Sequence, residues 1–324
     1  MFRNRLALIV TLAYFCLSLP MTVAAQNVAD VSENGIGFGA SQKTTWRVGV
    51  VVTASNGPMK SVIATVPVPV EWPEQDIKVV QEDTSRGVKI SHVDLGGVRQ
   101  MLVKMSGVRN GQSSKAVFTL DITRREITAP SDTSQFSIPK KVPRDVKRWL
   151  NNSPYINARD SKIRRMARDL AKEKESEGAW QQVEGIYDLV REKVEYKEGK
   201  IKSATQALKD GYGDCEELTS LFIAMCRAIK VPARMVWVPD HCYPEFYLTD
   251  QEGKGHWIPC QAAGTRAFGS MPEMRPILQK GDNFKVVGKD KPQRYVAEYV
   301  SAKPVRGSGA PKVSFVREFV QPGG

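Results

Sequence analysis

A cysteine stands directly before an apolar repeat in the segment 211–218, which reads Gly-Tyr-Gly-Asp-Cys-Glu-Glu-Leu. Asp214 is suited to cap a helix, and Glu217 three residues later completes a capping-box pattern. Apolar residues then follow at helical spacing, at Leu218, Leu221, Phe222, Met225 and Ile229. Cys215 is therefore expected in the first turn of a buried helix, where unpaired backbone N–H groups and the helix dipole favour a thiolate. The same N–H groups could stabilise an oxyanion, so we predict a nucleophile rather than a packed apolar cysteine.

A thiolate at this position needs a base, because two glutamates that follow it oppose its charge. His241 is the candidate, at the start of a strand predicted over 241–248, and a second strand returns over 256–261. If the hairpin between them centres on Gln251, His241 lies opposite Gln261, although the register depends on the turn type. The Gln261 side-chain oxygen could then orient the imidazole, as an Asp or Asn does in thiol enzymes.

These residues belong to a longer series of motifs that resembles the transglutaminase-like (papain-like thiol enzyme) superfamily. The motifs are Gly213–Glu217, Cys226–Arg234, His241–Leu248 and Trp257–Pro259, in the order and spacing of the family. The resemblance covers roughly residues 160–262 and implies that Cys215 is the nucleophile and His241 the general base and acid.

The chain departs from the family at one important position. Gln261 falls where the family usually has an Asp, and an amide can orient a histidine without stabilising imidazolium by charge. Asp240 and Asp250 are less favoured substitutes. The resemblance also implies that Tyr196 and Trp257 bind substrate, with burial in the core as the alternative for Tyr196.

In the assumed register Cys242 faces Cys260 across the hairpin. A disulfide and a pair of reduced buried cysteines are both open interpretations. A zinc site that adds His241 and His256 to these cysteines is disfavoured, because strand periodicity points the four side chains to different faces. We expect no metal and no cofactor.

The elements that position these residues predict an α+β protein. Short strands separated by turn residues indicate a β-sandwich domain over 40–127. A proline-containing connector over 128–159 follows. The catalytic domain is expected over 160–262, with an antiparallel sheet packed on the cysteine-bearing helix. Helices are predicted at 160–176, 179–194 and 204–209. The first is basic and amphipathic, and packing is favoured over a membrane surface. Residues 263–324 are predicted to be a basic C-terminal extension.

Residues 1–25 have the pattern of a secretory signal peptide. Arg3 and Arg5 precede the apolar stretch 6–19, and small residues before Gln26 resemble a cleavage site. A retained membrane anchor is the alternative. The protein is therefore predicted to be exported, to the periplasm, the cell envelope or the extracellular space.

The net charge of +12 comes from 47 Lys and Arg against 35 Asp and Glu. Residues 140–174 carry +8 and residues 263–324 carry +6, whereas residues 175–262 carry −5. No basic patch interleaved with aromatic residues accompanies this charge, which argues against a nucleic-acid partner. We expect a protein or peptide substrate, with cell-wall peptides as candidates, and basic flanks that associate with an anionic envelope.

The function predicted from these observations is an exported thiol enzyme with an amidase, protease or transamidase outcome. The main alternative is a catalytically inactive binding module of the cell envelope that keeps the same fold. Binding to an anionic polymer through the basic segments is a third, weaker alternative.

Overall fold

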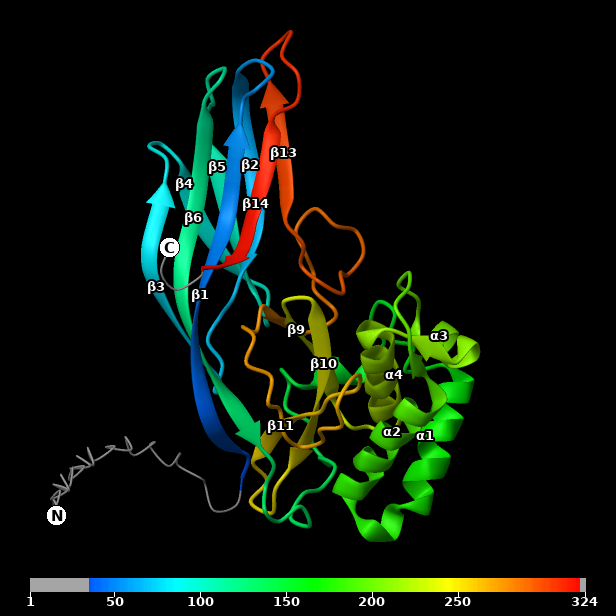
Figure 1. Cartoon of the computed structure of the whole chain (residues 1–324). Coiled ribbons are helices and arrows are strands. Elements are labelled where there is room, and N and C mark those ends of the chain that lie inside the picture. The colour runs from blue at the N-terminus through cyan, green and yellow to red at the C-terminus, as the bar shows by residue number, and fades with distance from the viewer. Residues whose placement is uncertain (1–34, 321–324) are drawn as a thin grey trace, which may run out of the picture.

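The computed structural model describes residues 35–320, which form a tall β-sandwich and a mixed α/β half beside its lower end (Figure 1). This arrangement confirms the predicted α+β class. The predicted signal peptide over 1–25 lies outside the described residues. Among the helices that are described, none has the length and hydropathy required to cross a membrane.

The sandwich consists of two four-stranded sheets whose neighbouring strands are all antiparallel. The first contains, in spatial order, β14 (Lys312–Phe319), β1 (Gly37–Thr53), β6 (Ser113–Thr128) and β3 (Gln75–Thr84). The second contains β13 (Tyr299–Pro304), β2 (Met59–Val68), β5 (Arg99–Met105) and β4 (Lys89–Asp94). Alternate residues of β1 and β2 face the space between the sheets, so valines such as Val50 and Val66 are fully buried there.

The prediction that the C-terminal segment is a basic extension is wrong for the part that contains β13 and β14. β14 pairs with β1 and β13 pairs with β2, so residues 299–319 complete both sheets of the sandwich. Val313 and Phe315 alternate with polar neighbours and pack against the sandwich core. Charged residues such as Lys312 and Arg317 hide this short alternation in the sequence. The sandwich is therefore built from segments at both ends of the described chain.

The α/β half places four helices on one face of a short sheet. The helices are α1 (Ser161–Glu173), α2 (Ala179–Lys193), α3 (Ala204–Asp210) and α4 (Cys215–Ala228). The sheet contains, in spatial order, β11 (Gly255–Pro259), β10 (His241–Thr249), β9 (Ala233–Val238) and β12 (Gln279–Lys280). A two-residue parallel pair joins β7 (Glu195–Tyr196) to β8 (Tyr212–Gly213), and short 3-10 turns lie at Lys147–Leu150 and Glu175–Glu177.

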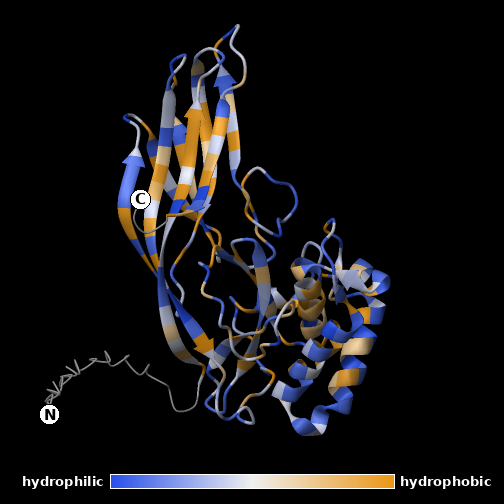
Figure 2. Ribbon diagram, in the orientation of Figure 1, coloured by the Kyte–Doolittle hydropathy of each residue, from blue (hydrophilic) through white to orange (hydrophobic). Residues whose placement is uncertain are grey.

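Helix α4 is the centre of the α/β half. It contacts the other three helices and lies against β10 and β9, and its side chains from Leu218 to Cys226 are almost all buried. Helix α1 turns Ile163 and Ala167 into the same core, which agrees with packing rather than a membrane surface. Figure 2 shows hydrophobic residues along α4, between the sheet and the other helices. The nucleophile predicted at the start of α4 is therefore carried by the most firmly packed helix of this half.

The second face of the short sheet meets the sandwich. Val236 and Tyr243 pack there against Ile127 near the end of β6. Buried charges cross the same junction: Lys280 on β12 bonds both Glu74, just before β3, and Glu245 on β10. The sheet thus lies between the helices and the long lower ends of β1 and β6 (Figure 1).

Candidate active site

Cys215 is the first residue of α4, as the capping pattern predicts. The Asp214 side chain accepts a hydrogen bond from the Glu216 N–H at 2.8 Å, and the Glu217 carboxylate accepts from the Asp214 N–H at 2.9 Å. A Cβ at Gly213 would lie 2.5 Å from the Glu217 Cβ, so only glycine fits beside this cap. The reactive sulfur is therefore fixed at a rigid helix start and is half-buried rather than enclosed.

His241, the first residue of β10, lies between Cys215 and Gln261. Its Nε2 is 3.1 Å from the Gln261 Oε1, and the ring lines the same cleft as Cys215, whose thiol raises the pKa of His241. Because an amide oxygen only accepts, Nε2 donates to Gln261 and Nδ1 remains to exchange a proton with the thiol. The structure thus brings together the three side chains that the sequence analysis selected.

The backbone of Gln261 is held independently of its side chain. Its carbonyl accepts from the Tyr187 hydroxyl at 2.9 Å and from Arg191 at 3.2 Å, and its N–H donates to Ala267 at 2.7 Å. These three bonds fix the loop after β11, so the amide is presented to the imidazole from a constrained position.

The hairpin register that we assumed is wrong by two residues. Glu245 pairs with Pro259, so the hairpin centres on Glu252, and β11 ends before Gln261. The turn has this length because the Asp250 carboxylate accepts from the N–H groups of Glu252 and Lys254. Gln261 therefore reaches His241 from a loop rather than from the facing strand position.

The corrected register also separates Cys242 from Cys260. Cys242 pairs with Trp237 on β9, whereas the Cys260 N–H donates to the Pro244 carbonyl. All four cysteines of the described chain are free thiols, and Cys226, Cys242 and Cys260 are buried. Burial raises the pKa of each of these three thiols well above its ordinary value.

Cys215 differs from the other thiols because its pKa is lowered to about 5. The largest cause of the lowered pKa is a hydrogen bond with the Cys242 side chain. The hydrogen bond and charge of His241 and a bond with the Cys242 backbone also lower it, whereas burial raises it. Burial lowers the pKa of His241, but its bonds to Cys215 and Gln261 and the thiolate charge raise it by more. The contacts between the two groups therefore favour the thiolate of Cys215 and the protonated form of His241.

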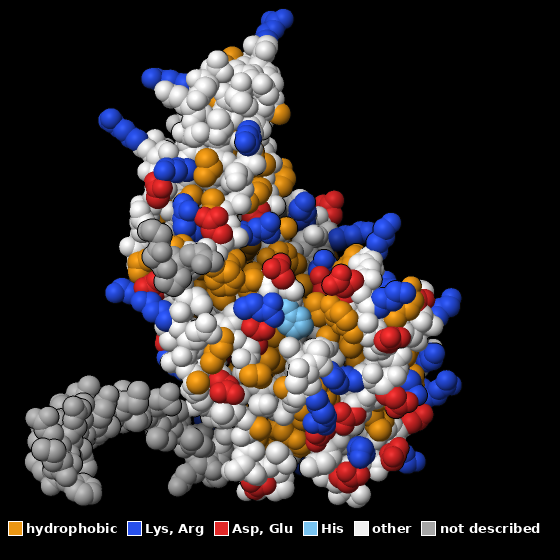
Figure 3. All heavy atoms as spheres, in the orientation of Figure 1, with side chains coloured by type: hydrophobic (Ala, Val, Ile, Leu, Met, Phe, Trp, Pro, Cys, Tyr) orange, Lys and Arg blue, Asp and Glu red, His pale blue; other side chains and the backbone are white. Residues whose placement is uncertain are grey.

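Cys215 and His241 lie in a cleft of about 680 Å³ at the boundary with the sandwich. Trp237 and Tyr295 line it beside Cys215 and His241, and Trp46, Arg317 and Phe319 line it from β1 and β14. On the face shown in Figure 3, a histidine side chain is visible at this boundary among hydrophobic and charged side chains. Sequence patterns gave no indication that strands at the two ends of the chain contribute to the same cleft.

A family model described as the transglutaminase-like superfamily matches residues 164–262, which include Cys215, His241 and Gln261. This domain belongs to the transglutaminase-like superfamily. A search of curated proteins found no match to the chain.

Two solved structures resemble the chain. A proposed cysteine protease from Cytophaga hutchinsonii aligns with a TM-score of 0.53 and 16% identity, over 85% of this chain and all of that one. The likeness therefore extends beyond the transglutaminase-like domain and concerns the fold alone. A proposed protease from Parabacteroides distasonis aligns with a TM-score of 0.27 and 13% identity, over 71% of this chain and 48% of that one, which carries no argument.

Both glutamates beside Cys215 in the transglutaminase-like domain have partners within the protein. Arg294, from the segment after β12, forms an ion pair with Glu216 and places its guanidinium 5.3 Å from the Trp237 ring centre. Burial raises the pKa of Glu216, whereas Arg294 acts in the opposite direction. Glu217 is buried and accepts from the Lys202 N–H at 2.8 Å as well as closing the cap. Arg294 is a residue of the site that the sequence analysis missed.

The two predicted substrate-binding residues have different outcomes. Tyr196 is 52% exposed, which excludes the core alternative, and it lines a second hollow of about 450 Å³ with Leu218 and residues 262–264. Trp257 does not reach the cleft. Its ring lies 4.0 Å from the Arg234 guanidinium and 5.2 Å from the Tyr247 ring, because strand alternation turns it away from α4.

Among the described residues, neither aspartate considered as a substitute for Gln261 hydrogen-bonds the His241 side chain. Asp250 accepts from His256 Nε2 at 2.7 Å near the hairpin turn. Asp240 lies in the turn before β10, with a φ of 56°, and lines the cleft. In the described part of the chain, Gln261 is therefore the residue that orients the imidazole.

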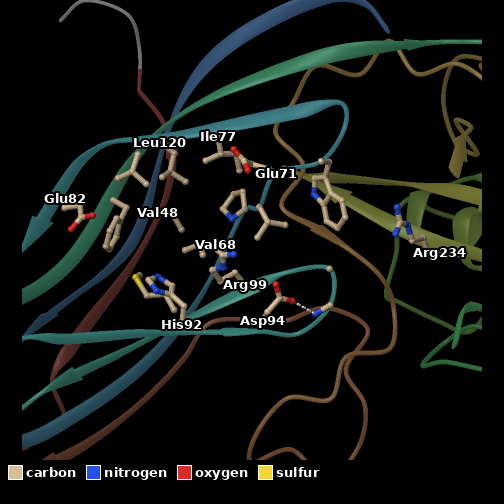
Figure 4. Close-up of a pocket in the computed structure, with 18 of the residues that line it drawn as sticks. Val48, Val68, Glu71, Ile77, Glu82, His92, Asp94, Arg99, Leu120 and Arg234 are labelled. Atoms are coloured by element: carbon tan, nitrogen blue, oxygen red, sulfur yellow. Dashed lines mark hydrogen bonds between the residues drawn. The ribbon is translucent and has the colours of Figure 1, made fainter. Parts of the chain in front are cut away.

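A separate cavity of about 770 Å³ opens between the two sheets of the sandwich (Figure 4). Apolar side chains such as Val48, Ile77 and Leu120 form its walls, and His92 and Arg99 lie at its edge. His92 belongs to β4, and no cysteine is among the residues that line this cavity. Within residues 35–320, no cluster of three or more His, Cys, Asp or Glu side chains could hold a metal ion.

Proposed function

We propose that the protein is an exported thiol enzyme that forms an acyl-thioester on Cys215 from a carboxamide or peptide carbonyl. The observation that carries the proposal is the pKa of about 5 at Cys215, whose partner His241 is oriented by Gln261 at the wall of an open cleft. A depressed thiol pKa beside a held histidine is the arrangement that nucleophilic catalysis by cysteine requires.

The reaction begins when the Cys215 thiolate attacks the carbonyl carbon. As the C–N bond breaks, the His241 imidazolium gives its proton to the departing amine or ammonia, and the acyl group remains as a thioester. Neutral His241 then takes a proton from water, which gives hydrolysis, or from an attacking amine, which gives transamidation. The Cys215 N–H is the first of α4, and Asp214 caps the next two, so this N–H is the natural donor to the oxyanion.

Gln261 gives this reaction a specific acid–base character. An amide supplies no charge, so the imidazolium depends on the thiolate for its stabilisation. Once the thiolate sulfur has bonded the carbonyl carbon, that stabilisation ends and His241 becomes a stronger acid toward the leaving amine. His241 is then neutral in the second step, and the uncharged amide of Gln261 is a suitable partner for a neutral imidazole.

Export and the choice of substrate are parts of the same proposal. The support is the signal-like segment 1–25 and the positive charge of residues 140–174 and 263–324, which would hold the enzyme near an anionic envelope. The expected substrate is a protein or peptide, with cell-wall peptides as candidates. N-terminal sequencing of the exported protein tests export: a chain that starts at Gln26 agrees with cleavage, and retention of residues 1–25 would indicate an anchor.

A substrate-independent test of the chemistry uses p-nitrophenyl acetate, which acylates activated thiols. We expect a burst of one p-nitrophenolate per protein and an acetyl group on the tryptic peptide that contains Cys215. Cys215→Ala should abolish both, and His241→Ala should slow the burst. If neither variant differs from the natural protein, the enzyme proposal fails and an inactive envelope-binding module becomes the better account.

A further inference from the structure

Strand β14 is the outer strand of its sheet, and it ends at the catalytic cleft. In the spatial order of that sheet β14 comes first, with β1 as its only neighbour among the described strands. Its last residues Arg317 and Phe319 line the same cavity as Cys215 and His241. Phe319 is 45% exposed, and most of the strand is partly or fully exposed. An accessible strand edge therefore leads directly to the reactive thiol.

The alternation of hydrogen bonds between β14 and β1 shows which backbone groups of β14 are available to bind another strand. The Val320 N–H donates to Thr45, the residue directly opposite, at 2.9 Å. In an antiparallel pair bonded and non-bonded positions alternate, so the even-numbered residues of β14 bond β1. The N–H and C=O groups of the odd-numbered residues point away from the sheet; these residues are Val313, Phe315, Arg317 and Phe319. Within residues 35–320, a row of donors and acceptors without strand partners thus faces the outside.

We propose that the peptide substrate of this enzyme adds to the sheet as an extra strand beside β14. This inference rests on the proposed function, because the peptide is the one whose carbonyl Cys215 attacks. Main-chain bonds to a strand edge hold an extended peptide without regard to most of its side chains. The edge of β14 and the Cys215 thiol line the same cavity, so they form one binding surface. A peptide bound along this edge therefore reaches the thiol, and this identifies it as the substrate.

The direction of β14 fixes which part of the substrate lies on it. The strand runs toward the cleft, with Phe319 at the cleft and Lys312 far from it. All pairs in this sheet are antiparallel, and an antiparallel partner would run away from the cleft. Its N-terminal end therefore lies at Cys215, and the residues after the attacked carbonyl follow β14. The acyl side is left for the hollow beside Tyr196 and Leu218.

Chloroacetyl peptides test this arrangement, because their electrophile alkylates Cys215 while the peptide extends from it in the proposed direction. The probes are chloroacetyl-capped Thr-Val repeats of one, three, five and seven residues. Each alkylation rate is divided by that of chloroacetamide with the same variant, which corrects for changes in the thiolate. We expect this ratio to rise roughly tenfold for each two-residue step that adds a bonded pair.

The variant that tests the edge is Arg317→Pro, with Arg317→Ala as its matched control. Both remove the ion pair with Glu298, but only proline removes the outward N–H. Proline is tolerated on an edge strand at such a position. We expect the dependence on length to persist in Arg317→Ala and to stop beyond the first step in Arg317→Pro.

Three results would overturn the inference: a ratio independent of length, equal behaviour of the two variants, or a length effect only in peptidyl chloromethyl ketones, which extend in the opposite direction. Pairing of β14 with a second copy of the chain, seen as a dimer that Arg317→Pro dissociates, would overturn it as well. Failure of the proposed function has a different signature, since chloroacetamide would then alkylate Cys215 no faster than an ordinary thiol.

Discussion

Two polar clusters meet on strand β10, and they differ in what their charges can do. At the start of the strand, His241 joins Cys215 and Gln261 at the wall of a cleft. Four residues later, Glu245 bonds Lys280 and Arg234 at the junction with the sandwich, and both Glu245 and Lys280 are almost completely buried. One strand therefore carries a reactive pair and a closed network of ion pairs.

The comparison shows how burial separates reactivity from stability. In the His241 cluster both Cys215 and His241 can gain or lose a proton, and their contacts lower the pKa of Cys215 to about 5 and raise the pKa of His241. At Glu245 burial raises the pKa, but Lys280 and Arg234 lower it by more, so the carboxylate stays charged. The first cluster is suited to chemistry, and the second fixes the sheet to the sandwich that completes the cleft.

The largest expected effect comes from His241→Ala. We expect the rate of acetylation by p-nitrophenyl acetate to fall by about 10²- to 10⁴-fold, the range found for general acid–base groups. The free energy of unfolding should change little, because His241 is only half-buried. Stopped-flow kinetics and urea denaturation measure the two quantities. A large loss of stability with little loss of rate would contradict the assignment of this cluster to chemistry.

Glu245→Gln should show the opposite behaviour. Removing one member of a buried ion-pair network leaves the others uncompensated, so we expect a loss of about 3 kcal/mol in the free energy of unfolding. In urea the midpoint should fall, while the pH dependence of Cys215 alkylation in the folded protein stays the same. A changed pH profile without a change of stability would show that the two clusters are not separate.

A smaller effect is expected at Gln261. Gln261→Ala removes the group that orients the imidazole, and we expect a rate loss of about tenfold, near the energy of one hydrogen bond. Gln261→Asp places a negative charge beside the imidazolium, which raises the pKa of His241 and moves the alkaline limb of the rate profile to higher pH. If this limb stays in place in Gln261→Asp, the contact between the two side chains is not part of the mechanism.

The smallest effect on the rate of acetylation at neutral pH is expected at Cys242. Cys242→Ala removes the thiol that bonds the Cys215 sulfur, so the pKa of Cys215 should rise while His241 still activates it. Cys260→Ala is the matched control, because it removes a buried thiol that does not contact Cys215. Iodoacetamide kinetics below pH 6 should show slower alkylation in the first variant alone, and equal rates in both would contradict the role of Cys242.

The sequence predicts the local parts of the site because each depends on neighbours within a few residues. The cap at Asp214 and the apolar stripe after Cys215 are of this kind, and they place the start of α4 correctly. The prediction of the hairpin register was wrong because hydrogen bonds to the Asp250 side chain determine the turn. Sequence periodicity does not reveal such bonds. His241 and Gln261 nevertheless meet, through a loop rather than through the predicted strand pairing.

Contacts between segments that are distant in the sequence could not be predicted from sequence patterns. Arg294 lies 78 residues after Glu216, and Phe319 reaches the cleft only because β14 joins the sandwich. Neither segment has a motif of its own, since short alternation and single arginines are common in loops and edge strands. The mouth of the cleft is therefore a product of tertiary structure, whereas the reactive centre is a product of local sequence.

The central claim, that Cys215 is held as a thiolate by His241 together with Cys242, is tested most directly by the rate of Cys215 alkylation with iodoacetamide between pH 4 and pH 10. A thiol with a lowered pKa contributes thiolate at every pH above that pKa. We therefore predict an acid limb with its midpoint near pH 5 in the natural protein. In His241→Ala the midpoint should move upward, toward the ordinary cysteine value of about 8.5. A midpoint near that ordinary value in both proteins would contradict the account.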